Sequence, residues 1–282
     1  MIVYNYLIGN YMNLLNNTGF RKGLGSLGSK LLSILSAENK EVFSVKDAET
    51  ALNRKGNNLV KLLHDLNVNK WILRLERGKY IVLPLEAGPH SEYMTHPFVI
   101  ARSLVSPYYI SFLSALNYYG ITEQPSHKVF IATTKIKKHF VFQSQEYAFV
   151  RLAKKRFFGF NEEWINNSKF YISDKEKTVI DCLFIPKYCG GLTEVVKAFK
   201  EKLDYEKIYN YAIKMEDIAT LKRLGYILTI LKIKTPVIEK LLKMVSGGYS
   251  LLDTGGPRTG FRNNKWKIIE NIQKEELIKK VL

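Results

Sequence analysis

The sequence predicts an α+β protein with an N-terminal winged helix-turn-helix and a larger α+β domain behind it. In the first third of the chain, apolar side chains recur at helical spacing and are followed by two short alternating stretches. Beyond them, strand-like stretches precede a run of amphipathic helices, so we expect antiparallel strands and then helices in the larger domain. We place an N-terminal extension at 1–22, the winged domain at 23–84, a linker at 85–97 and the larger domain at 98–282.

The N-terminal domain is expected to contain three helices. Ser44 and Asp47 have the spacing of a capping box at the start of the second helix. The polar stretch 53–56 ends in Gly56 and has the length of a turn that joins two helices at a steep angle. The apolar positions that define the helices are Leu24, Leu27, Leu31, Ile34 and Leu35, then Val45, Ala48, Ala51 and Leu52, then Leu59, Leu63 and Leu66.

The third helix, at about 57–67, and the hairpin after it, at 71–83, carry the candidate DNA-binding residues. Asn can pair with adenine in the major groove, and Lys can reach guanine or phosphate. Winged-helix domains also serve as protein-binding modules, so a partner protein is the alternative; the local positive charge favours DNA. The candidate residues are Arg54, Lys55, Asn57, Asn58, Lys61, Arg74, Arg77 and Lys79.

The chain is strongly basic, with 43 Lys and Arg against 26 Asp and Glu and a formal net charge of +17. Such a charge attracts polyanions, nucleic acid first and an anionic membrane surface second. The excess is spread evenly, at +5 in residues 1–90, +6 in 91–160 and +6 in 161–282. Both expected domains are therefore basic, and no basic tail accounts for the charge.

The cysteine content is typical of a reducing compartment, and the hydropathy pattern bears on membrane insertion. Cys182 and Cys189 are too few for a disulfide framework and are expected to be buried thiols. We find neither a signal peptide nor an apolar run long enough to span a membrane, so a cytoplasmic protein is expected.

The larger domain contains a group of acids that could suggest an enzyme. Asp174, Glu176 and Asp181 lie near lysines, as a metal-dependent nuclease requires, but helix capping and packing explain them better. In this interpretation Ser173 and Glu176 form a capping box. We therefore expect no catalytic residue, no metal, no cofactor and no small-molecule substrate, and hence not an enzyme.

Three stretches of the larger domain resemble the AbiEi family: ISFLSALNYYGIT (110–122), ISDKEKTVIDCLFIPKYCGGLTEVVKAF (172–199) and LKRLGYIL (221–228). The resemblance implies a transcriptional regulator that binds its own promoter and acts as the antitoxin of a viral-defence system. It further implies that the protein counteracts a nucleotidyltransferase toxin. The residues that carry the resemblance are Ser114, Ala115, Leu116 and Gly120, Glu176, Lys177, Thr178 and Asp181, and Leu224, Gly225 and Tyr226.

Overall fold

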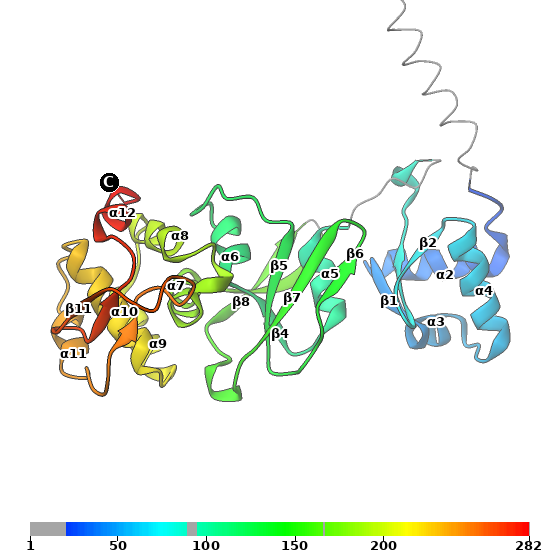
Figure 1. The fold of residues 1–282 in the computed structure, drawn as a ribbon. Coiled ribbons are helices and arrows are strands. Elements are labelled where there is room, and N and C mark those ends of the chain that lie inside the picture. Colours follow the sequence, from blue (N-terminus) through cyan, green and yellow to red (C-terminus); the bar gives the residue numbers. More distant parts are fainter. Residues whose placement is uncertain (1–20, 89–94, 166, 282) are drawn as a thin grey trace, which may run out of the picture. The chain divides into compact units, whose positions relative to one another are not determined.

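The computed structural model describes residues 21–88, 95–165 and 167–281 and is an α+β structure, as predicted (Figure 1). The chain forms two compact units. Unit 1 holds the described residues up to Ser103 together with Ile165–Ser168, and unit 2 holds the rest. Unit 1 thus continues beyond 85–97, where the sequence places the linker. Most of the predicted N-terminal extension lies outside the described residues.

Unit 1 contains a helix, a second helix, a turn, a third helix and a hairpin, in the order expected from the sequence. A short strand, β1, precedes the second helix and pairs antiparallel with β3, which is central in the sheet β1-β3-β2. The elements are α2 (Gly25–Ala37), β1 (Val42–Ser44), α3 (Val45–Leu52), α4 (Asn57–Val68), β2 (Ile72–Glu76), β3 (Lys79–Val82), η1 (Leu85–Ala87) and α5 (Pro97–Leu104).

Most of the core of unit 1 comes from the predicted apolar stripes of α2, α3 and α4, and β1 and β2 add Phe43 and Ile72. Burying one leucine side chain in such a core stabilises the fold by about 1.5–3 kcal/mol. Gly28 lets α2 approach α4, because a Cβ there would lie 2.9 Å from Leu66 Cδ2. The buried side chains are Leu31, Leu35, Phe43, Ala48, Leu52, Leu59, Leu63, Leu66 and Ile72.

The predicted capping box at the start of α3 is present. The Asp47 amide donates to Ser44 Oγ over 3.2 Å, and the Ser44 amide donates to Asp47 Oδ2 over 2.8 Å. Two of the amides that a helix start leaves free are thereby satisfied.

Unit 2 is built on a six-stranded sheet with the order β6-β7-β5-β4-β9-β8. The sheet is mixed, so the expected antiparallel arrangement is only partly correct. β4 pairs antiparallel with β5 and β6 with β7, whereas β5 and β7 are parallel and so are β4 and β9. The strands are β4 (Tyr108–Ile110), β5 (Lys128–Thr133), β6 (Phe140–Phe142), β7 (Gln145–Arg151), β8 (Phe160–Ile165) and β9 (Ser168–Ser173).

Helices dominate unit 2 after the sheet, as expected. A small sheet, β10-β12-β11, follows them. The elements are α6 (Phe112–Tyr118), η2 (Lys154–Arg156), α7 (Lys175–Phe184), η3 (Pro186–Tyr188), α8 (Leu192–Val196), η4 (Lys197–Lys200), α9 (Tyr205–Lys214), α10 (Ile218–Ile230), α11 (Val237–Leu242), β10 (Ser250–Leu251), β11 (Phe261–Asn263), β12 (Ile268–Glu270) and α12 (Lys274–Lys279).

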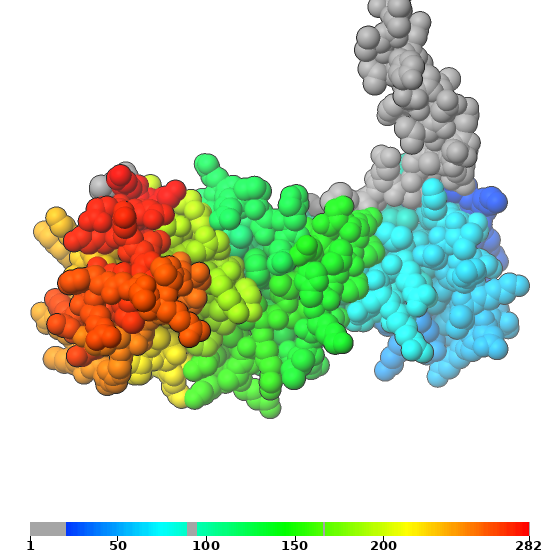
Figure 2. All heavy atoms as spheres, viewed as in Figure 1, coloured from blue at the N-terminus to red at the C-terminus, as the bar shows by residue number. Residues whose placement is uncertain are grey.

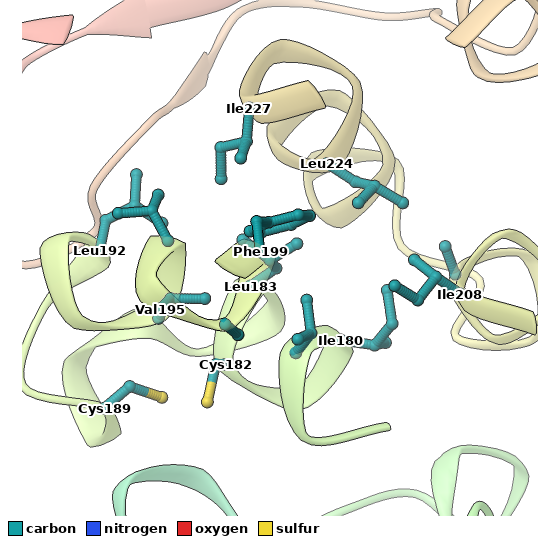
Figure 3. Close-up of a cluster of buried hydrophobic side chains, with 14 of the residues drawn as sticks. Ile180, Cys182, Leu183, Cys189, Leu192, Val195, Phe199, Ile208, Leu224 and Ile227 are labelled. Atoms are coloured by element: carbon teal, nitrogen blue, oxygen red, sulfur yellow. The ribbon is translucent and has the colours of Figure 1, made fainter. Parts of the chain in front are cut away.

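The helical core of unit 2 gathers apolar side chains from α7, α8, α9 and α10 (Figure 3). Gly225 in α10 packs directly under the ring of Trp266. A Cβ at this position would lie 2.0 Å from Trp266 Cζ3, so only glycine fits there.

Candidate nucleic-acid interface

The turn between α3 and α4 brings two cations to the surface of unit 1. Asn53 ends α3 in the left-handed region, with φ 49°, and Gly56 precedes α4 with φ 81°. Glycine and asparagine tolerate positive φ better than other residues. Arg54 and Lys55 lie between them and are exposed, as a phosphate contact at this turn requires.

The exposed face of α4 carries the polar residues that the sequence singles out. Leu59, Leu63 and Leu66 are buried, and Asn57, Asn58 and Lys61 point away from them. Lys61 lies one turn beyond Asn57, so both side chains occupy the same stripe of the helix.

The exposed side of α4 also has three residues that are not among the candidate DNA-binding residues. Val60 and Val68 are 59% and 62% exposed, and His64 is exposed as well. Exposed valines on a polar face can make apolar contacts, for example with the methyl group of thymine in the major groove. The leucine periodicity directs positions 64 and 68 outward, whereas position 60 lies at the edge of the leucine stripe.

The hairpin β2–β3 follows α4 and presents Arg74 and Arg77. Both side chains are exposed, and Gly78 forms the turn with φ 74°. Asn67 at the end of α4 fixes the hairpin, because its Oδ1 accepts a hydrogen bond of 2.9 Å from the amide of Arg74. Asn67 is a positioning residue that the sequence alone did not indicate.

Five of the predicted cations keep free charged groups in the described part of unit 1. They form no ion pair there, so their charges remain available to an anion. The five are Arg54, Lys55, Lys61, Arg74 and Arg77.

Lys79 differs from the other candidates. Its Nζ lies 2.9 Å from Glu76 Oε1 and also donates to the Ser103 carbonyl oxygen. The side chain is half-buried and its charge is compensated, so we leave it out of the interface.

In unit 2, the three acids considered for metal catalysis are engaged in hydrogen bonds. Asp174 is the N-cap of α7 and accepts from the Lys177 amide over 2.7 Å. Glu176 accepts from the amide of Asp204 and from Lys207 Nζ, over 3.2 and 2.9 Å. Among the residues that the structure describes, no group of three His, Cys, Asp or Glu side chains could hold a metal ion.

The predicted capping box of Ser173 and Glu176 is wrong. Ser173 ends β9, and its hydroxyl contacts Ser111 Oγ at 3.1 Å and Thr178 Oγ1 at 2.7 Å. The pairing of β9 with β4 brings Ser111 close, and this non-local contact competes with local capping.

The third acid, Asp181, forms a buried ion pair with Lys177. Both side chains are fully buried, and Asp181 Oδ2 also accepts from the hydroxyls of Tyr109 and Ser111, over 3.0 and 2.9 Å. Burial and the Asp181 charge raise the pKa of Tyr109, which keeps its hydroxyl protonated as a donor. Lys177 Nζ also lies 4.7 Å from the centre of the Phe158 ring.

Cys182 and Cys189 are buried free thiols, as predicted. Figure 3 shows both sulfur atoms beside the apolar cluster that contains Ile180 and Val195. Burial, followed by the neighbouring Cys182 thiol, raises the pKa of Cys189, which disfavours the reactive thiolate. No helix in the described ranges is both long and apolar enough to cross a membrane.

Comparisons with known proteins identify a shared fold. No family model and no curated protein sequence matches the chain. Its structure is similar to the crystal structure of the Rv2827c protein from Mycobacterium tuberculosis, with a TM-score of 0.66 and 11% identity. The similarity covers 93% of this chain and 97% of that protein. At this identity the comparison supports the α+β fold alone.

Proposed function

We propose that unit 1 is a winged helix-turn-helix that binds duplex DNA, with α4 in the major groove and the hairpin β2–β3 on the backbone. The observation that carries the proposal is the exposed face of α4, where Asn57 and Lys61 share one stripe. Unpaired cations flank this stripe on both sides, in the preceding turn and in the hairpin.

The residues of this interface have distinct roles in the proposal. Asn57 and Lys61 read base edges, since amide and ammonium groups recognise adenine and guanine in the major groove. Arg54, Lys55 and Arg77 contact phosphates, which supply affinity and orientation but no sequence information.

We further propose that the protein is a cytoplasmic transcriptional regulator that represses its own operon as the antitoxin of a nucleotidyltransferase toxin. This part rests on the resemblance to the AbiEi family. Several residues that carry the resemblance have structural roles here: Gly225 accommodates Trp266, and Lys177, Thr178 and Asp181 belong to the buried network.

A protein-binding role for α4 is the second candidate. It is favoured by Val60 and Val68, whose exposed apolar groups would also suit a protein partner. In that case the binding energy would come from the valines and not from Lys61.

A pair of variants separates the two functions. We expect Lys61→Ala to weaken binding to the protein's own upstream DNA by about 1–3 kcal/mol, and Arg77→Ala to weaken all DNA sequences alike and lower the salt slope by about one. Lys30→Ala is the control, because Lys30 is an exposed lysine on α2, outside the proposed interface.

Fluorescence anisotropy with labelled duplexes measures these affinities. If Lys61→Ala and Lys30→Ala bind upstream DNA equally well, the proposed interface is misplaced. If Val60→Ser alone abolishes capture of a partner protein and the wild-type protein shows no DNA binding, the second candidate holds.

A further inference from the structure

Two cations of unit 2 lie over the ring of Tyr249, and a third donates a hydrogen bond to the residue before it. The guanidinium carbon of Arg262 lies 5.4 Å from the ring centre of Tyr249, and Lys267 Nζ lies 5.3 Å from it. The Tyr249 hydroxyl donates to Asn264 Oδ1, which fixes the position of the ring. The charged groups of Arg262 and Lys267 therefore lie no further apart than the sum of their distances to the ring centre.

The third cation, Lys222, reaches the same place from α10. Its Nζ donates to the carbonyl oxygen of Gly248, the residue before Tyr249, and only 2% of Lys222 is exposed. Burial, followed by the charge of Lys267, lowers the pKa of Lys222. The positive charge of Lys267 thus acts against that of Lys222.

No carboxylate compensates these charges in the described part of unit 2. Lys222, Arg262 and Lys267 form no ion pair there, although many other lysines of the chain do. Like charges held together without a counter-ion destabilise the fold. A bound anion would relieve this repulsion.

Lysine is also an unfavourable choice at two of the three positions. A buried ammonium group without a carboxylate has a high desolvation cost. Lys267 has φ 50°, in the left-handed region that suits glycine or asparagine.

We propose that Lys222, Arg262 and Lys267 form a binding site for a phosphate group, with Tyr249 as the spacer that orients two of them. An Arg fork binds two phosphate oxygens at once, and the lysines add point charges. Arg262 is exposed and Lys267 is partly exposed, so a ligand can reach these two cations from the surface of the chain that is orange to red in Figure 2. The site belongs to unit 2 and does not depend on DNA binding by unit 1.

Calorimetric titration of the full chain tests the site with two sources of phosphate, inorganic phosphate and adenosine 5′-monophosphate, at constant ionic strength in chloride. We expect saturable binding of at least one of them, and Arg262→Gln to weaken it about tenfold, since hydrogen bonds between charged groups are the strong ones. Tighter binding of the nucleotide identifies a nucleotide phosphate as the ligand, and equal binding identifies free phosphate. Failure of both to bind overturns the proposal.

The matched control is Lys187→Gln. Lys187 Nζ lies 4.9 Å from the ring centre of Tyr188, in the same kind of contact, but no second cation among the residues that the structure describes lies over that ring. We expect this variant to bind like the wild type. If Lys187→Gln and Arg262→Gln weaken binding equally, the effect is one of general charge and the site is refuted.

Thermal unfolding separates a binding role from a structural one. We expect Lys222→Met and Lys267→Asn to keep or raise the melting temperature while they abolish the rise that phosphate produces in the wild type. If both variants melt earlier than the wild type and still respond to phosphate, the cations are structural and the proposal fails.

Discussion

The buried pair of Lys177 and Asp181 gives the largest expected effect on stability. The substitution Lys177→Met removes the ammonium group and leaves the Asp181 carboxylate in a site with no exposure, with the hydroxyls of Tyr109 and Ser111 as its remaining partners. Removing one partner of a buried ion pair costs about 3–5 kcal/mol. For a domain of 150–250 residues, each kcal/mol lowers the melting temperature by about 2–4 °C, so we expect a drop of roughly 10 °C.

Scanning calorimetry on the full chain measures this drop, and the double variant Lys177→Met with Asp181→Leu is its control. Replacing both charges by apolar groups of similar size removes the uncompensated carboxylate, so most of the lost stability should return. A single variant as stable as the wild type would refute the reasoning. It would show that loss of the Lys177 ammonium group does not leave an uncompensated charge at Asp181.

Three further predictions concern caps and packing. Ser44→Ala removes the hydroxyl partner of Asp47 in the capping box and should lower the free energy of unfolding by about 1 kcal/mol in urea titrations; an unchanged midpoint would contradict this. Burial raises the pKa of Asp47, but hydrogen bonds from Ser44 and Lys40 outweigh it and lower that pKa overall. Its stabilisation is therefore present above about pH 4 and lost as the pH falls through the folded pKa, and an Asp47→Asn variant should lack this acid-dependent loss. Gly225→Ala forces a methyl group into Trp266 and should cost about 1–3 kcal/mol or more, whereas Gly23→Ala, with open space around it, should be neutral when both are measured by thermal unfolding.

Local patterns predicted α2, α3 and α4 because their signals lie within a few residues of one another. Ser44 and Asp47 are three residues apart, and the leucine stripe of α4 needs only the helical period. Both features follow from the sequence before any tertiary contact is known.

The missed features depend on contacts between distant residues. Ser173 bonds to Ser111, 62 residues away, so its local capping signal was misleading. The Lys79 ammonium group is engaged by the Ser103 carbonyl, 24 residues away, which removes it from the predicted interface. The parallel pairing of β5 with β7 likewise has no local signal, because strand order is set by the packing of the whole sheet.

The most direct test of DNA binding by unit 1 is a gel-shift titration of the protein with its own upstream DNA and with a scrambled duplex, at two salt concentrations. We expect tighter binding to the upstream DNA and a steep loss of affinity as salt rises, because phosphate contacts by Arg54, Lys55 and Arg77 release counterions. Equal and weak binding to both duplexes would contradict sequence-specific recognition by α4 and leave only a general attraction of a basic protein to polyanions.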